Sequence, residues 1–293
     1  MKLLYLLING VLLAAALPGL SGAADLQQGT LKAWNEYIRG ADLRMTNRVN
    51  GPRPFLWSDE SPDRDARVRR GEVVIAPMVG RGTEDVPDGL IHDWIGAVFI
   101  PGTTTESLLT VVHDYDAYKR VYKPVVTDSR MLACTATDQE FSMTLKRRVL
   151  FVTAALEGRY RAHDVAVDSR RGYNIAGTTE VQEVEDYGHG GEHLLPPDSG
   201  SGYIWRLHSI ARYEERDGGV YLELEAIALT RDIPVSLRWL VSPVVNHLSI
   251  NSLTATLRQT RQAVIALPPQ AEPLAVCTGR IRRQIAALPS GGQ

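Results

Sequence analysis

Two histidines and a glutamate in the string His189-Gly190-Gly191-Glu192-His193 have residue types that could bind a metal. In the order H-x-x-E-H such residues hold zinc in a class of metalloproteases, where both histidines lie on one helical face. Here two glycines lie inside the string and Pro196-Pro197 follow it, so the segment is expected to be a loop. No third ligand is visible in the sequence, and we therefore expect neither a protease nor a metal site.

Other catalytic signatures do not match. The stretch Asp198-Ser199-Gly200-Ser201-Gly202 departs from the G-x-S-x-G turn of serine hydrolases, and no helix follows it. The glycines at 188, 190 and 191 lack dinucleotide-loop spacing, and no phosphate-binding loop occurs. The sequence predicts no catalytic residue and no cofactor.

Charged side chains gather on one face of the clearest hairpin, which joins residues 203–216 to 220–231. Asp217-Gly218 suits a two-residue turn, which places Arg212 opposite Glu223 and Ile210 opposite Glu225. A slip by one residue would exchange the two faces. The charged face carries Arg206, His208, Arg212, Glu223, Glu225 and Arg231, together with Ile210, Ile227 and Leu229.

Two interpretations of this charged face remain open. Base rates favour a solvated outer face with weak ion pairs. The isoleucines and the leucine on it favour a face covered by the N-terminal part of the chain. If the face is covered, Arg206 and Glu225 become candidates for recognising a polar head group, because a buried charge needs a partner.

The other face of the hairpin is apolar, and its middle is small. Under the same register Ser209 pairs with Ala226, Ala211 with Leu224, and Leu207 with Ala228. Trp205 and Tyr213 lie further along this face.

The elements that position these faces are strands and short helices. Strand-like runs occupy residues 90–100, 125–134, 141–148, 150–160, 173–185, 203–216 and 220–231. Short helices are expected at 103–112 and 116–122, where Tyr115, Tyr118 and Tyr122 suit a core or a pocket rim. A run over 236–242 ends before Pro243, and a longer helix covers 249–267.

Residues 25–85 are predicted to form an arm that precedes the main domain. A helix over 30–39 with Thr30 as its N-cap precedes a loop-rich stretch over 47–88. The cluster Phe55-Leu56-Trp57 and the apolar run 73–78 are expected to dock on the main body, because exposing them to water is unfavourable.

This order of elements resembles the helix-grip fold of the START and polyketide-cyclase superfamily. The resemblance is carried by Phe99-Ile100-Pro101-Gly102-Thr103, by residues 112–118 (VHDYDAY), by Tyr122-Lys123-Pro124, and by the hairpin with its following helix. It covers residues 86–266 and is nearest to secreted bacterial START-like proteins without an assigned reaction. It implies an α+β domain in which a curved, seven-stranded antiparallel sheet wraps round a long C-terminal helix.

A curved sheet around one helix leaves a cavity where the facing side chains are small, and an apolar cavity is the usual form of a hydrophobic-ligand site. The expected ligand-binding residues are Trp205, Leu207, Ser209, Ala211, Leu224, Ala226 and Ala228, with Leu253 and Leu257 of the helix as the opposite wall and Arg206 and Glu225 as polar groups. Alternatively, the alanines serve only to let the helix approach the sheet closely.

The resulting hypothesis is non-enzymatic binding or transport of a lipid, isoprenoid or polycyclic compound, with a transient membrane contact for ligand exchange. One alternative is an enzyme of the cyclase or aromatase type, in which His208 and Glu225 would act as acid and base. A structural envelope module with a filled core is the other. Oligomeric state does not follow from the sequence.

Composition and the N-terminus set the expected compartment. A formal net charge of −2 gives no reason to expect nucleic acid as a partner. Residues 1–24 read as a signal peptide cut after Ala23 or Ala24, which predicts a secreted or periplasmic protein. The expected order is signal peptide 1–24, arm 25–85, helix-grip domain 86–267 and flexible tail 268–293. Whether Cys134 and Cys277 pair is left open.

Overall fold

The computed structural model describes residues 24–149, 152–233 and 235–267. The predicted signal peptide, apart from Ala24, and the predicted tail lie outside these residues. Cys134 is disulfide-bonded, whereas Cys277 lies outside the described part. No helix in the described ranges is long and apolar enough to cross a membrane.

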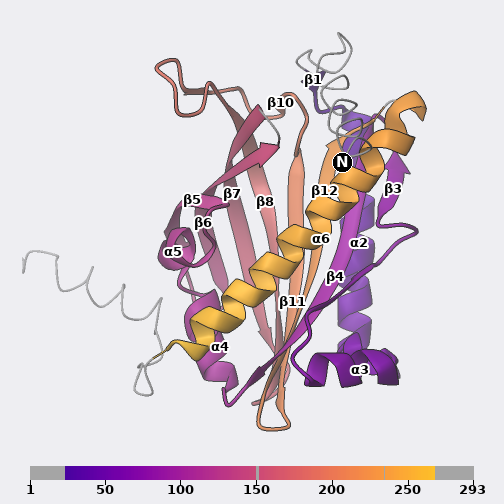
Figure 1. The fold of residues 1–293 in the computed structure, drawn as a ribbon, viewed down its shortest axis with the longest axis vertical. Helices are drawn as coiled ribbons and strands as arrows, with labels where there is room; N and C mark the ends of the chain where they lie inside the picture. Colours follow the sequence, from indigo (N-terminus) through magenta and orange to yellow (C-terminus); the bar gives the residue numbers. More distant parts are fainter. Residues whose placement is uncertain (1–23, 150–151, 234, 268–293) are drawn as a thin grey trace, which may run out of the picture.

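One large antiparallel sheet organises the chain, and its strands run in the spatial order β2-β4-β12-β11-β8-β7-β6-β5 (Figure 1). The long strands are β4 (Gly89–Pro101), β5 (Val126–Cys134), β6 (Asp138–Val149), β7 (Val152–Ala166), β8 (Arg171–Glu185), β11 (Arg206–Arg216) and β12 (Gly219–Arg231). These are the seven predicted strands. Short strands extend the sheet to ten: β2 (Val74–Pro77) and β3 (Thr83–Val86) pair with β4, and β9 (His193–Leu194) pairs with β8.

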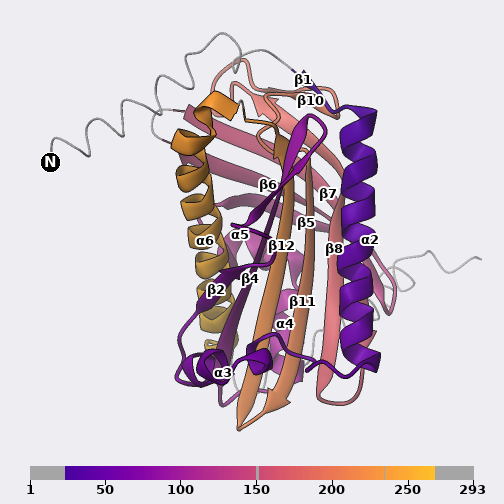
Figure 2. The ribbon, with the colours of Figure 1, turned by 90° about the vertical axis from the view of Figure 1, so that its right-hand side faces the viewer.

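Two long helices cover opposite faces of this sheet. Figure 2 shows α6 (Val235–Ile265) along one face and α2 (Gln28–Asn50) along the other. The fold is therefore the predicted α+β helix-grip arrangement, with an additional layer built by the N-terminal arm. Every residue of β4 except Pro101 is buried, because this strand lies between the two layers.

Both long helices exceed the lengths predicted from the sequence. α2 begins at Gln28, so Thr30 is not the N-cap; its hydroxyl donates instead to the carbonyl of Pro87 at 2.7 Å. α6 continues through Pro243, where a helix end was expected. A proline removes one backbone hydrogen bond and can kink a helix, but the turns on either side keep their own bonds.

Short elements close the remaining edges. The smaller helices are η1 (Ser58–Glu60), α3 (Pro62–Arg69), α4 (Thr105–Val112), η2 (Tyr115–Ala117) and α5 (Tyr118–Val121). Thr104 caps α4, within the helix predicted over 103–112, by accepting a hydrogen bond from the Ser107 amide. β1 (Ala24–Asp25) pairs with β10 (Ser199–Gly200) as a separate two-stranded sheet.

The β11–β12 register is the predicted one. Ser209 lies opposite Ala226, Arg212 opposite Glu223, and Arg216 opposite Gly219. Asp217 and Gly218 both have positive φ, at 55° and 76°. A two-residue turn of this kind matches the twist of the flanking strands and fixes which side chains share a face.

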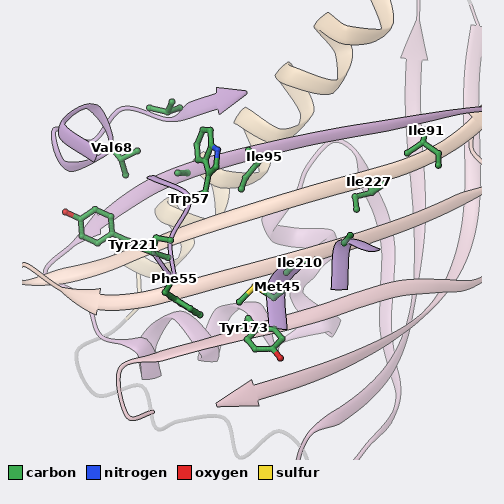
Figure 3. Close-up of a cluster of buried hydrophobic side chains, with 14 of the residues drawn as sticks. Met45, Phe55, Trp57, Val68, Ile91, Ile95, Tyr173, Ile210, Tyr221 and Ile227 are labelled. Carbon is green, nitrogen blue, oxygen red and sulfur yellow. The ribbon is translucent and has the colours of Figure 1, made fainter. Parts of the chain in front are cut away.

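A hydrophobic cluster forms between the arm and the face of the sheet that α2 covers (Figure 3). We call this the outer face and the face that α6 covers the inner face. Met45 of α2 and Phe55 and Trp57 of the following loop share this cluster with Ile210 and Ile227 of the sheet; in Figure 3 Met45 lies next to Ile210, and Trp57 lies next to Ile95. The predicted docking of the arm is thus confirmed, and the charged hairpin face is covered rather than solvated.

Buried charges lie among these apolar groups. The carboxylate of Glu223, which has no solvent-exposed surface, accepts hydrogen bonds from the amides of Trp57 and Ser58 at 2.8 Å each. Arg212 donates to Glu225 at 2.8 Å and lies 3.6 Å from Glu223. Each buried carboxylate therefore has donors, and Glu223 ties the arm to the sheet.

Asp93 of β4 extends this network toward α2. It accepts a hydrogen bond from the Tyr37 hydroxyl at 2.7 Å and lies 3.5 Å from the half-exposed Arg44. Its second carboxylate oxygen is buried without a partner. Burial and the nearby Glu225 carboxylate raise the pKa of Asp93 to about 7.

Replacing Glu223 should destabilise the fold. Glu223→Ala removes the acceptor for two amides and one of the two carboxylates beside the buried Arg212. We therefore expect the free energy of unfolding, measured by urea denaturation, to fall by about 3–5 kcal/mol. Glu140→Ala, at an exposed ion pair of β6, is the control and should change it by about 1 kcal/mol or less. Equal effects of the two variants would contradict this account of the arm.

Asp93 should make stability depend on pH. Between about pH 4 and 7 the folded chain keeps the proton on Asp93 while the unfolded chain releases it, so this group lowers the unfolding free energy as pH rises. Burial lowers the pKa of the adjacent His92 to about 4, which has the opposite effect between pH 4 and 6.5.

The variant Asp93→Asn separates the contribution of Asp93 to this pH dependence from that of His92. The difference in unfolding free energy between this variant and the wild type should shift in favour of the variant by about 2–4 kcal/mol from pH 4 to pH 7. Asp63→Asn, on the exposed side of α3, should show no such shift. A constant difference for Asp93→Asn across this range would refute the assignment.

Candidate functional site

A row of small side chains crosses the face of the sheet that α6 covers. Strand pairing aligns Ala162 of β7, Ala176 of β8, Ser209 of β11 and Ala226 of β12. Trp94 of β4 continues the row at one end. We call these four small residues the floor.

Side chains of the hairpin on this inner face are partly accessible, although they lie in central strands. They are Leu207, Ser209, Ala211, Leu224, Ala226 and Ala228. Their neighbours on the outer face, from Arg206 through Arg212 and from Glu223 through Leu229, are buried under the arm. The inner-face side chains of the hairpin are therefore less completely covered than those of its outer face.

α6 makes its closest approach at β4. A Cβ atom at Gly96 would come within 2.6 Å of Leu257 Cδ1 and 3.2 Å of Leu253 Cγ. A Cβ atom there would also come within 2.4 Å of Ile75 Cδ1, so a larger residue at position 96 would require these side chains to shift, and Gly96 favours the close packing of the helix at that side of the sheet. Ala226 also packs against the cluster that contains Leu253 and Leu257, so the alternative in which the alanines permit the close approach stays open. Leu253 and Leu257 anchor the helix and form one side wall.

An aromatic stack forms the wall on the other side of the floor. Phe141 of β6 lies between Tyr115 and Tyr160, with ring centroids 4.0 Å and 4.9 Å away. Tyr122 joins this wall to α6, since its hydroxyl lies 3.0 Å from that of Thr260. The tyrosines expected in a core or pocket rim thus lie beside the small residues. Burial raises the pKa of Tyr115 and Tyr160, so both stay neutral donors.

One corner of the inner face is polar. Asp164 of β7 accepts hydrogen bonds from Gln139 and Asn174 at 2.8 Å each, and its carboxylate lies 3.1 Å from His113 Nε2. Burial by itself would raise the pKa of Asp164, but these hydrogen bonds and the His113 charge outweigh it and hold the pKa below its usual value. Asp164 therefore stays ionised and fully partnered.

A second polar group lies on the inner face of β6. Arg147 shares a face with Phe141 and Met143 by strand alternation, and its guanidinium donates to the Ser252 hydroxyl of α6. Tyr203 is close enough for the Arg147 charge to oppose the burial that raises the Tyr203 pKa. Arg147 thus spans from the sheet to the helix.

The predicted polar site residues lie on the other side of the sheet. Arg206 pairs with Asp198, and Glu225 pairs with Arg212 and Arg44. The predicted acid–base pair is separated as well, because His208 contacts Asp42 of α2 at 3.0 Å. Strand alternation points all three side chains toward the arm, so they do not face the space beside α6.

Trp205 also departs from its predicted place. β11 begins at Arg206, so the alternation that would put Trp205 on the inner face does not reach it. Trp205 packs in the cluster beneath the arm, over Gly202. The inner-face groups Asp164, His113 and Arg147 were missed from sequence; the alternation of β6 and β7 could have placed Asp164 and Arg147, but not the contact with His113.

Two surface hollows lie elsewhere. One, of about 580 Å³, is lined by residues of α2 between Gln28 and Arg39. The other, of about 340 Å³, lies at the β11–β12 turn beside Arg170. Neither touches the floor.

The histidine string is exposed; residues 189–192 form a loop, as expected, and His193 begins the short strand β9. His193 lies 3.2 Å from Glu185, and its Nδ1 lies 2.8 Å from the carbonyl of Gly191. Within the described ranges, no group of three or more histidine, cysteine, aspartate or glutamate side chains is arranged to hold a metal ion.

Comparison with known proteins gives similarity in structure only. No family model matches the sequence. No curated protein matches it either. Similar solved structures include a STAR-related lipid transfer protein fragment from Xanthomonas axonopodis (17% identity, 66% of this chain and 98% of that one, TM-score 0.41). Human STARD10 (9%, 65% and 76%, 0.41) and the Zhui aromatase/cyclase from Streptomyces sp. R1128 (14%, 60% and 97%, 0.36) are others.

Proposed function

We propose that the protein binds and carries a hydrophobic small molecule in the space between the inner face of the sheet and α6. The single observation that carries this proposal is the accessibility of small and apolar side chains in the middle of a covered sheet. Apolar surface next to water is unfavourable, and an apolar molecule lying on it would remove both surfaces from water.

The walls of the space suit this role. Leu253 and Leu257 bound it on one side and the stack around Phe141 on the other, so most of the lining is apolar or aromatic. Polar groups are few and lie apart, at Asp164 and at Arg147. Mostly apolar walls with a few placed polar groups are the usual composition of such sites.

We further propose that carriage takes place outside the cytoplasm and that ligand exchange involves brief contact with a membrane. The signal-like residues 1–24 support the first part. The low solubility of apolar ligands in water supports the second.

Filling the floor should abolish binding. Ala226→Trp adds an indole at the centre of the inner face, so organic extraction followed by mass spectrometry should recover an apolar compound from the wild type and little or none from the variant. Ala255→Trp, at an exposed position of α6, should retain the compound. Circular dichroism should show both variants folded.

The outcomes against this proposal are definite. Equal recovery from Ala226→Trp and the wild type would mean that the ligand lies elsewhere. An empty wild type whose thermal stability no lipid, isoprenoid or polycyclic compound raises would reject carriage, because binding to the native state stabilises it.

A second candidate function is acid–base catalysis in the same space, and His113 with Asp164 favours it. A histidine oriented by a carboxylate is the usual arrangement of a general acid–base group. In that case His113→Gln should co-purify with a compound of different mass from the one extracted from the wild type. The same compound from both would support carriage alone.

A further inference from the structure

We infer that the ligand is an amphiphile with a single anionic head group, and that the Arg147 guanidinium binds this head. This inference rests on the proposed function, since it assigns the polar end of the same space. The head group would be a carboxylate or a phosphate, and the apolar part would lie over the floor.

Arg147 lies where a head group could meet it. Strand β6 pairs with β7 without a register shift from Asp138 to Val149, so Arg147 lies on the same face as Phe141 and Met143. Its hydrogen bond to Ser252 of α6 confirms this direction independently. A group bound to Arg147 would therefore lie at the edge of the space that α6 and the sheet enclose.

Among the described residues, no counter-charge pairs with Arg147. In the described part of the chain, the neutral Ser252 hydroxyl is its hydrogen-bond partner, and no carboxylate lies within ion-pair distance of it. A guanidinium has five N–H donors and stays charged at any physiological pH. Most of its donors are therefore free for a ligand, and its planar fork suits two oxygens of one anion.

Acidic groups of the surrounding elements are already engaged. Glu183 of β8 accepts hydrogen bonds from the amides of Ser201 and Gly202 and from the Ser201 hydroxyl. Asp164 is held by Gln139, Asn174 and His113. An anionic head would meet repulsion at Asp164 and attraction at Arg147, so the charges orient the ligand with its head at Arg147.

The surface between these ends suits a chain. The floor and Leu207 present small or aliphatic side chains, and Phe141 and Tyr160 bound them with aromatic rings. A neutral apolar compound would bind this surface equally well but would not pair with the Arg147 guanidinium. An anionic amphiphile would contact the apolar surface and also pair with Arg147.

The test compares an acid with its neutral ester. Pyrene-labelled hexadecanoic acid and its methyl ester are titrated by fluorescence into the full-length wild type and Arg147→Gln. Charge-assisted hydrogen bonds are stronger than neutral ones, so Arg147→Gln should weaken binding of the acid by about tenfold or more and leave the ester unchanged. Arg147→Lys keeps the charge and should lose less affinity for the acid than Arg147→Gln does.

The control is Arg159→Gln, the same substitution at an exposed arginine on the other face of β7. It should bind both probes as the wild type does. Competition with dodecanoate and dodecyl phosphate, compared with acetate and inorganic phosphate, separates the sources of the anion. Whichever of dodecanoate and dodecyl phosphate displaces the labelled acid at the lower concentration identifies the head group. If acetate or inorganic phosphate displaces the labelled acid and neither amphiphile does, an amphiphilic ligand is rejected.

The remaining outcomes also decide. If Arg147→Gln binds the acid as tightly as the wild type, or loses acid and ester equally, the head-group assignment is wrong. If the wild type binds the ester but not the acid, the ligand is neutral, and the proposed carriage stands without this inference. If the wild type binds neither probe and also yields no compound on extraction, the proposed function itself fails.

Discussion

The alternation of side chains along β11 and β12 is the constraint on which the rest of the structure depends. Because successive residues point to opposite faces, one register sends Ser209, Ala211 and Ala226 toward α6 and Arg212, Glu223 and Glu225 toward the arm. Each face then meets a different cover. The arm buries most of the charged face, whereas α6 packs on the apolar face at Gly96 of β4 and contacts Tyr122 and Arg147 on its other side, and the hairpin side chains beneath it stay partly accessible.

Burying three carboxylates and an arginine would normally be unfavourable, since ions lose hydration in a protein interior. Here the arm supplies what the sheet lacks: backbone amides for Glu223, the Tyr37 hydroxyl for Asp93, and Arg44 beside Glu225. The arm is therefore an integral layer rather than an appendage, and β2 and β3 extend the same sheet. This arrangement favours one position of α2, because a shifted helix would leave those charges unpaired.

The inner face is packed differently from the outer face. Its side chains form two separate clusters, one around Leu253 and Leu257 and one around Phe141; Ala226 packs against the first, Ala162 and Ala176 belong to the second, and Ser209 lies in neither. A single continuous core would have stabilised the fold more, since each buried methylene contributes about 0.8 kcal/mol. Leaving the middle small and accessible is the feature from which the proposed binding space arises. The two ionised groups beside it, Asp164 and Arg147, differ in that the first is fully partnered and the second is not.

Local patterns determined the strands, the register of the hairpin and the order of the elements. The Asp217-Gly218 turn and the alternation of small and charged residues are sufficient for these. Tertiary structure alone decided the rest. Whether a charged face is solvated depends on a helix far away in the sequence, so the sequence alone left open whether Arg206, His208 and Glu225 are solvated or covered. The packing at Gly96 and the contact of His113 with Asp164 likewise arise between distant segments, which no local spacing encodes, and α6 continues through Pro243 although a proline there predicts a helix end.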